Sequence, residues 1–288
     1  MGKPSRTAGR QDHALVEAAW LYYQQGLNQN EIAARMQVSR ATVVNHLNEA
    51  RARGWVRVHL DSDVFREHHL ADALCERFDL ADAIVVPDDP TDSSLSGTRV
   101  IKAAAEWLPR LLQPGDRLGV SWGETVFQMA QHLPHHPIDK LTVVQLLGSR
   151  PATPGFAAEA CTSLMALKLG GNCLNLHVPL LLSSQKLRDE LCNEPVVADQ
   201  LRKLDTCNKT VFACGTCADD AHIVRAGLLT AASMAQYRKK GAVGVVCGRL
   251  IDKDGQAIPS AVETRMIGIS LDQMRSKDMS LLVVAGPD

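Results

Sequence analysis

Apolar and polar residues follow two different patterns along this chain, and the change falls near residue 60. Within residues 28–54 the apolar positions recur at helical spacing, which predicts two short helices joined by a tight turn. From about residue 61, nearly continuous apolar runs alternate with stretches of helical periodicity. This alternation is typical of an α/β domain in which helices cover a mostly parallel sheet. The pattern therefore predicts two domains, residues 1–60 and residues 61–288.

The same runs predict the elements of the larger domain. Its expected helices span residues 97–112, 125–132, 157–169 and 221–240. Its expected strands span residues 83–86, 118–120, 141–147, 210–213, 243–246, 266–269 and 281–284. Residues 252–255 lie between two apolar segments and are expected to form a hairpin turn. They are too few to form a calcium-binding loop.

The first short helix of the smaller domain has a well-marked start. Asn28 can cap this helix, and Glu31, three residues later, completes a capping box. A face that can be buried is formed by Ile32, Ala33 and Met36. A supporting helix over residues 14–25 and a strand over residues 55–60 are expected on either side.

The second short helix presents a polar surface near its start. Ser39 is a good N-cap and Gly54 ends the helix. The core-facing positions are expected to be Val43, Val44, Leu47 and Ala50. The opposite face stays exposed near the start of the helix, which is the part of a recognition helix that enters the major groove. Side chains on this face can bond to bases or phosphates. The predicted DNA-binding residues are Gln29, Ser39, Arg40, Ala41, Thr42, Asn45 and His46.

A helical bundle that binds no ligand would show a similar pattern, so the charge distribution matters. Residues 1–60 contain eight Lys and Arg against four Asp and Glu, whereas residues 61–288 contain 23 against 28. The basic smaller domain favours contact with phosphates, although the chain as a whole is nearly neutral.

Composition places the chain among globular proteins with two hydrophobic cores. Its 288 residues are 45% hydrophobic, which is sufficient for a small and a larger core. No apolar run approaches the roughly 18 residues of a membrane span, and the first residues lack the apolar core of a signal peptide. A cytoplasmic protein is therefore expected.

The eight cysteines are expected to be reduced thiols. Four of them lie in apolar runs and are expected in the core: Cys75, Cys161, Cys173 and Cys247. Cys214 and Cys217, followed by Asp219, Asp220 and His222, form the one cluster that could bind a metal or act in redox chemistry. A single such pair without a second pair is weak support, so no metal and no cofactor are expected.

The loops that follow the predicted strands are the expected place for a ligand, because crevices in such sheets lie beyond the carboxyl ends of the strands. Residues 119–125 run from a strand through glycines into a helix, where free N–H groups and hydroxyls can bond an anion. Arg150 follows the next strand and supplies a cation. The predicted ligand-binding residues are Gly119, Ser121, Trp122, Gly123, Glu124, Thr125, Gly148, Arg150 and Gly215.

Over nearly its whole length, the chain resembles transcriptional regulators of the SorC family. The matching segments are the helix-turn-helix with residues 39–42, then residues 119–125, 147–148, 241–244, 252–255 and 266–269. The resemblance implies a Rossmann-like α/β effector domain of the kind found in sugar-phosphate isomerases and CoA transferases. It also implies an oligomer, a homotetramer or homodimer, that binds operator DNA and responds to a sugar or sugar phosphate.

Two departures from the family pattern affect the expected pocket. The family resemblance implies an acid after residues 241–244, where this chain has Val245. It also implies a lysine-bearing helix and a further strand after residues 285–286, where this chain ends within two residues. A weakened pocket or a different effector is expected, together with exposed apolar surface near residues 281–284.

Together, the helix-turn-helix and the family resemblance predict a regulator of a carbohydrate catabolic operon. The protein is not expected to be an enzyme. The alternative is an isomerase-like enzyme fused to a DNA-binding head, with Glu124 or Asp219 as its base, but the spacing shows no base beside a proton donor. A third interpretation is a scaffold that binds DNA without sequence preference.

Overall fold

The computed structural model describes residues 6–56, 69–87, 93–150 and 158–285. Packing divides the chain into two compact units, Met1–Leu60 and Asp61–Asp288. Each unit has its own cluster of buried apolar side chains. We call the first unit the head and the second the effector unit.

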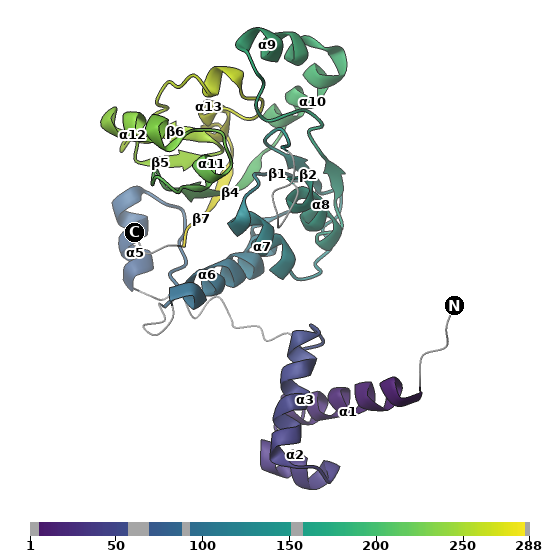
Figure 1. Cartoon of the computed structure of the whole chain (residues 1–288). Helices are drawn as coiled ribbons and strands as arrows, with labels where there is room; N and C mark the ends of the chain where they lie inside the picture. The colour runs from purple at the N-terminus through teal and green to yellow at the C-terminus, as the bar shows by residue number, and fades with distance from the viewer. Residues whose placement is uncertain (1–5, 57–68, 88–92, 151–157, 286–288) are drawn as a thin grey trace. The chain divides into compact units, whose positions relative to one another are not determined.

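The described part of the head, residues 6–56, contains three helices, α1 (Arg6–Tyr23), α2 (Gln29–Met36) and α3 (Arg40–Ala52) (Figure 1). The capping box at the start of α2 is confirmed. The Asn28 side chain accepts hydrogen bonds from the N–H groups of Asn30 and Glu31, and the Glu31 carboxylate accepts one from the Asn28 N–H at 2.7 Å. These bonds satisfy donors that the first turn leaves without helical acceptors.

A tight turn separates α2 from α3, as predicted. Gln37 takes a left-handed conformation with φ of 56°, and the Ser39 hydroxyl then accepts the Thr42 N–H to cap α3. Val43 is buried in the core of the head together with Leu47 and Ala50. Val44 is only half-buried, so its assignment to the core was wrong.

The flanking elements of the head differ in extent from the prediction. The supporting helix α1 begins at Arg6 and ends at Tyr23. Residues 55–56 belong to no strand, and the rest of the strand predicted over residues 55–60 lies outside the described residues.

The effector unit is built on a sheet whose central strands are parallel, as predicted. Five parallel strands lie in the order β3-β2-β1-β4-β7, and a β5-β6 hairpin pairs antiparallel with the end of β4. The strands are β1 (Arg117–Val120), β2 (Thr142–Gln145), β3 (Asn172–Leu174), β4 (Lys209–Gly215), β5 (Gly244–Val246), β6 (Arg249–Ile251) and β7 (Met279–Val283).

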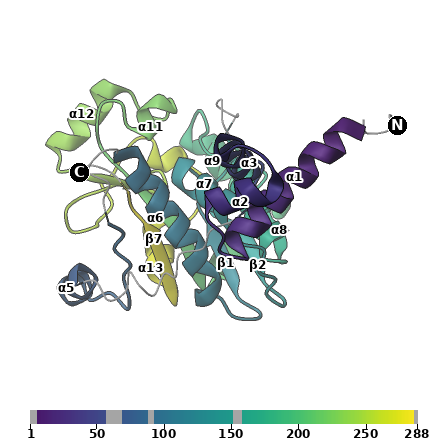
Figure 2. The ribbon, with the colours of Figure 1, turned by 90° about the horizontal axis from the view of Figure 1, so that it is seen from below.

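Helices cover both faces of this sheet. On one face α6 (Ser93–Trp107), α7 (Glu124–His132) and α8 (Ala158–Lys168) lie side by side (Figures 1 and 2). The other face packs against α10 (Pro195–Asp205), α11 (His222–Arg225), α12 (Ala231–Lys239) and α13 (Leu271–Arg275). The remaining helical segments are α5 (His69–Phe78), α9 (Gln185–Asn193) and the 3₁₀ turns η1 (Leu108–Leu111) and η2 (Glu263–Arg265).

Three predicted elements of the effector unit were wrong. Residues 83–86 join no strand ladder among the described residues. Residues 266–269 form only isolated bridges, Leu181 to Met266 and Leu147 to Gly268. The helix predicted over residues 221–240 is broken, because Gly227 has a φ of 69° and Thr230 starts a new helix as an N-cap. Periodicity alone did not show these interruptions.

Strand β7 pairs with β4, and no partner covers its other edge within the described part of the chain. Leu282 is 48% and Val284 is 54% exposed, whereas Leu281 and Val283 are buried. The expected exposure of apolar surface near the end of the chain is therefore correct for two of these four residues and wrong for the other two.

A buried ion pair fixes the amino end of the sheet. Asp116, which is 8% exposed, accepts hydrogen bonds from Lys209 Nζ at 2.7 Å, Asn208 Nδ2 at 2.8 Å and the Gln113 N–H at 2.7 Å. Burial by itself raises the pKa of Asp116, but these hydrogen bonds and the charge of Lys209 outweigh it, so the pKa is lowered overall. The pair joins the start of β1 to β4.

We expect Asp116→Asn to lower the free energy of unfolding by about 3 kcal/mol at pH 7, because Lys209 loses its counterion. The lowered pKa makes the carboxylate stabilising above the unfolded value of about 4 and removes that stabilisation as pH falls through the folded value. The difference between the two proteins should therefore shrink below about pH 4. Urea unfolding at pH 7, 5, 4 and 3 measures it.

Asp139→Asn is the control, since Asp139 forms only an exposed pair with Lys140 and should cost little at any pH. A difference for Asp116→Asn that stays constant down to pH 3 would show that the charge of Asp116 is not its source.

Candidate functional site

The carboxyl ends of β1, β2 and β4 meet at one edge of the sheet. Val120 at the end of β1 lies opposite Gln145 in β2 and Val211 in β4. The ladders continue one step further, because the Ser121 N–H donates to Val211 and the Leu146 N–H donates to Val120. The loops that leave β1 and β2 therefore begin side by side, where the sequence predicts the ligand site.

A direct contact joins these two predicted loops. The Trp122 Nε1–H donates to the Gly148 carbonyl at 3.1 Å. The Trp122 side chain is half-buried and packs against the apolar clusters on both sides of the sheet. Ser121 is buried next to it. Trp122 therefore acts first as a structural link between the loops.

Helix α7 starts at this edge without a side-chain cap. Its N-cap is Gly123, and the first intrahelical bond runs from the Phe127 N–H to the Gly123 carbonyl. The N–H groups of the first turn, which contains Glu124 and Thr125, have no acceptor within the helix and carry part of the positive end of its dipole. The Glu124 carboxylate accepts a hydrogen bond from Gln128 one turn further on, at 2.7 Å. This geometry suits an anion.

Charged side chains from three segments converge on the same edge. Arg150 is half-buried, and its Nη1 is buried without a hydrogen-bond partner in the described part of the chain. The pKa of His222 is lowered, first by partial burial and then by the charges of Arg150 and Arg225, against the opposing charge of Glu124. His222 is therefore mainly neutral at neutral pH, and Arg150 supplies a cation with donor capacity to spare.

Gln145, the last residue of β2, is a site residue that the sequence did not indicate. It is 1% exposed, and its Nε2 donates to the Leu147 carbonyl at 2.6 Å and to Ser149 Oγ at 3.1 Å. Its Oε1 is buried and accepts no hydrogen bond from the described residues. A glutamine inside a predicted strand gave no signal of its own. His222 was noticed only as part of the possible metal cluster with Cys214 and Cys217, and not as a neighbour of Arg150.

Three of the four predicted glycines serve packing or pairing, whereas a Cβ at Gly123 would meet nothing within 4 Å. A Cβ at Gly119 would lie 2.5 Å from Leu146 Cδ2, and one at Gly148 would lie 2.7 Å from the Pro179 carbonyl oxygen. Gly215 ends β4 and pairs with Val245. Close approach of neighbouring segments of the same chain therefore explains why glycine occupies positions 119 and 148 without a ligand.

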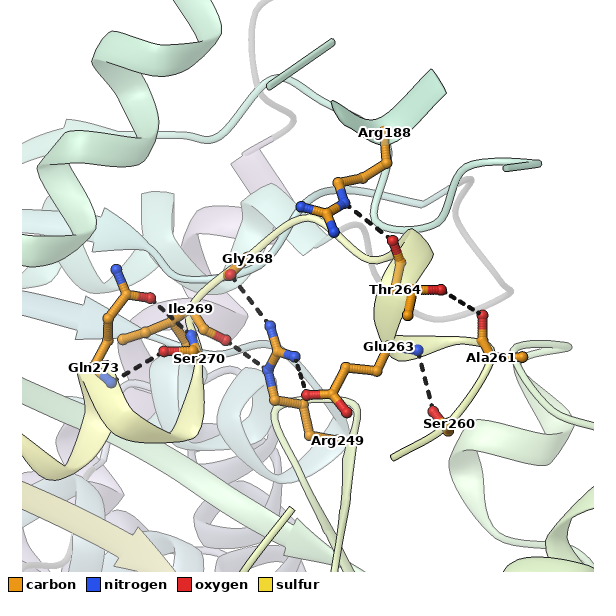
Figure 3. Close-up of polar contacts among 10 residues, drawn as sticks. All are labelled: Arg188, Arg249, Ser260, Ala261, Glu263, Thr264, Gly268, Ile269, Ser270 and Gln273. Atoms are coloured by element: carbon orange, nitrogen blue, oxygen red, sulfur yellow. Dashed lines mark hydrogen bonds and ion pairs between the residues drawn. The ribbon is translucent and has the colours of Figure 1, made fainter. Parts of the chain in front are cut away.

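A buried arginine holds the segment that supports the β2 loop. Arg249 in β6 donates to the Ile269 carbonyl at 2.8 Å, to the Gly268 carbonyl at 3.4 Å and to the Glu263 carboxylate at 2.8 Å (Figure 3). The held segment then pairs with the loop, since the Gly148 N–H donates to the Ile267 carbonyl. Arg249 thus positions the loop that carries Arg150.

The predicted DNA-binding residues lie on or near the start of α3. Arg40, Ala41 and Asn45 are exposed, and Arg40 Nε donates to the Gln29 side chain at 3.1 Å. Gln29 and Arg40 also line an open groove of about 580 Å³ at the start of α2.

The other three predicted DNA-binding residues are less free. The Thr42 hydroxyl is bonded to Ser39 at 2.8 Å within the cap. His46 is half-buried, and its Nδ1 is buried without a partner in the described residues. Among the predicted polar residues within α3, Arg40 and Asn45 are therefore the two that are exposed.

Each of the two alternative catalytic bases is bonded to another side chain. Asp219 forms an ion pair with Arg238 at 2.8 Å, and Glu124 bonds to Gln128. Within the described ranges, no three His, Cys, Asp or Glu side chains are placed to hold a metal ion.

All eight cysteines are free thiols. Cys161 and Cys247 are buried, as expected for core residues, and burial raises their pKa values to about 11 and about 12. Cys75 is half-buried and Cys173 is exposed, so the expectation for Cys173 was wrong. Cys173 lies in β3, whose residues are all exposed at the edge of the sheet.

A larger cavity of about 760 Å³ lies beside β7, away from the strand-end loops. Its lining is mainly apolar, with Asp79, Asp82, Asp278 and Ser280 as its polar side chains, and it includes none of the predicted ligand-binding residues. Among the described helices, none is both long and apolar enough to cross a bilayer.

Comparison with known proteins places both units. Residues 62–288 match the family model described as "Putative sugar-binding domain", and residues 18–64 match the MarR family model. The chain is 38% identical over 280 residues to the transcriptional regulator YjhU of Escherichia coli K12, covering 96% of this chain and 85% of that protein.

Two further likenesses extend over nearly the whole chain. The deoxyribonucleoside regulator of Bacillus subtilis is 30% identical over 274 residues, covering 94% of this chain and 87% of that protein. The crystal structure of the full-length sorbitol operon regulator SorC of Klebsiella pneumoniae superposes with a TM-score of 0.72 at 21% identity, covering 94% and 87% of the two chains. The two-part fold, a helix-turn-helix head and a larger α/β unit, is therefore confirmed.

We expect Arg249→Met to lower the free energy of unfolding by about 3 kcal/mol, because Glu263 and two buried carbonyl groups lose their donor. Arg202→Met is the matched control, since Arg202 pairs with Asp199 on the surface of α10 and should cost no more than about 1 kcal/mol. Urea unfolding of both variants measures the difference. Equal costs would contradict a positioning role for Arg249.

Proposed function

We propose that this chain, which belongs to the SorC family of sugar-binding transcriptional regulators, controls a carbohydrate catabolic operon in response to a sugar or sugar phosphate. One observation carries the proposal. A helix-turn-helix head is joined to an α/β unit whose strand-end loops present an uncapped helix start and a half-buried arginine, Arg150, whose Nη1 has no partner among the described residues. The similarity to named transcriptional regulators runs through both parts.

The head supplies the contact with operator DNA in this proposal. Arg40 and Asn45 are exposed on the first turns of α3, the part of a recognition helix that reaches base edges. The bond between Arg40 and Gln29 restrains the Arg40 side chain, which lowers the entropy that it loses on binding. Ser39 and Thr42 hold the start of α3 in place through the cap.

The effector unit supplies the response. An anion at the start of α7 would meet backbone N–H groups together with Arg150. The same edge, between the end of β1 and the first turn of α7, carries Ser121, Trp122 and Thr125. In this proposal they offer two hydroxyls and an aromatic face to a sugar. The name of the Bacillus subtilis relative agrees with an effector from carbohydrate or nucleoside breakdown.

Assembly and location complete the proposal. We place the protein in the cytoplasm as a homotetramer or homodimer, so that paired heads reach the two half-sites of an operator. The effector would shift the balance between DNA-binding and DNA-free forms, and a coupling of about 1 to 3 kcal/mol is enough for a several-fold change in occupancy.

We expect the protein to prefer the intergenic DNA beside its own gene over scrambled DNA, and to release it when one compound of a sugar phosphate panel is added. Fluorescence anisotropy at several salt concentrations measures both effects. Arg150→Met should lose most of its affinity for the compound, and with it the release, because the anion loses its cation. Steeply salt-dependent binding that is equal on both DNAs, with no effect of any compound, would rule out the proposal.

We expect Arg40→Ala to weaken binding to the preferred DNA by about 1 to 3 kcal/mol while binding to scrambled DNA falls much less. Arg53→Ala is the charge-matched control, because Arg53 lies at the far end of α3 in ion pairs with Asp12 and Glu49. Arg53→Ala should weaken binding to the preferred DNA and to the scrambled DNA about equally. An equal loss on both DNAs for Arg40→Ala would assign Arg40 to phosphate contact instead of base reading.

A further inference from the structure

We propose that Gln145 recognises a hydroxyl group of the effector, so that the site selects a hydroxylated phosphate over an anion that has no hydroxyl. The inference rests on the proposed function, because it concerns the same effector site. It adds a residue outside the predicted loops and a rule for the class of ligand. The observation behind it is a buried acceptor that the described residues leave without a donor.

The orientation of the Gln145 amide is fixed by its neighbours. The group at 2.6 Å from Nε2 is the carbonyl oxygen of Leu147, which can only accept a hydrogen bond. The amide nitrogen must therefore face Leu147 and Ser149, and a flipped amide would bring two oxygens together. Oε1 consequently lies on the other side of the planar group and is available as an acceptor.

The position of Gln145 places this acceptor at the base of the candidate site. Gln145 ends β2, opposite Val120 at the end of β1, and its amide bonds to Ser149, the neighbour of Arg150. The Gln145 amide therefore contacts the loop that carries Arg150, and a ligand held by Arg150 and the start of α7 would lie beside the end of β2. Arg150 Nη1 and Gln145 Oε1 are a donor and an acceptor that both lack partners within the described residues.

The helix next to β2 carries a second buried polar atom without a partner among the described residues. Thr162 is buried on α8, the helix that packs against β2, and its hydroxyl has no partner in the described part of the chain. Buried polar groups are normally hydrogen-bonded, so two such atoms on adjoining elements indicate a place for polar ligand atoms. A hydroxyl group can donate to Gln145, whereas an alkyl phosphate offers Oε1 nothing at a pH where its phosphate is fully ionised.

The required ligand thus combines an anionic end with a hydroxylated stem. A site built to bond a hydroxyl rejects an analogue without it far more strongly than an apolar pocket rejects a change of size. This chemistry matches a sugar phosphate or polyol phosphate and disfavours a simple carboxylate or phosphate anion.

The test compares matched ligands on the full-length protein. Isothermal titration at pH 8 gives dissociation constants for ribose 5-phosphate, 2-deoxyribose 5-phosphate, glucose 6-phosphate and glycerol 3-phosphate. Butyl phosphate serves as the anion without a hydroxyl group. We expect at least one hydroxylated phosphate to bind the unmodified protein at least tenfold more tightly than butyl phosphate, and this comparison needs no variant.

Gln145→Met then assigns the selectivity, because methionine has nearly the same shape and no acceptor oxygen. We expect the preference over butyl phosphate to fall to within about threefold. Ser149→Ala is the control, since it removes a partner of Nε2 but leaves Oε1 in place, and it should keep the preference. Circular dichroism and thermal unfolding establish that both variants are folded.

Each other outcome overturns the inference in a recognisable way. No preference in the unmodified protein, or the same preference in Gln145→Met, shows that Gln145 does not select the ligand. If a sugar phosphate still releases DNA from Gln145→Met as it does from the unmodified protein, the proposed function stands and the inference fails. If no phosphate binds and none affects DNA binding, both fail together.

Discussion

The loop that carries the candidate site depends on the buried guanidinium of Arg249. This group binds two main-chain carbonyls and Glu263, and so fixes residues 268–269 against β6. The adjoining Ile267 and Ile269 then bond to Gly148 and Leu146, at the two ends of the turn that leaves β2. Backbone bonds also hold this segment, because Ile267 donates to the Leu180 carbonyl although residues 266–269 form no regular strand. The buried cation of Arg249 therefore adds to a short ladder, and both support the loop that carries Arg150.

Local interactions are the part of this fold that could be predicted from the sequence. Asn28, Glu31 and Ser39 act within three residues of their own positions, and each forms the predicted bond. Strands β1 and β2 were also predictable, because most of their residues are buried and form continuous apolar runs, whereas β3 is exposed throughout and was not predicted. Residues 83–86 have the same composition but no strand partner among the described residues, and composition does not say which runs will find a neighbour.

The site was predictable only in outline, for a related reason. Glycines and an arginine after strands pointed to one edge of the sheet, and that assignment stays a prediction. Gly119 and Gly148 are explained by close approach to Leu146 and Pro179, which are distant in sequence although close in space. Gln145 carried no signal, because its importance arises from the geometry of the turn that follows it. The effect of Arg150 on the pKa of His222 joins residues 72 positions apart, and no local pattern could reveal it.

The same reasoning connects Val245 with Gln145. The family resemblance implies an acidic hydroxyl acceptor at position 245, but this chain has a buried valine there, packed against Gly215. A sugar in this site must find acceptors for its hydroxyls elsewhere, since a buried hydroxyl without a partner weakens binding. Gln145 supplies a neutral acceptor from the opposite side of β1. A neutral amide does not repel the phosphate as a second carboxylate beside Glu124 would, so the exchange favours an effector whose charge lies close to its hydroxyls.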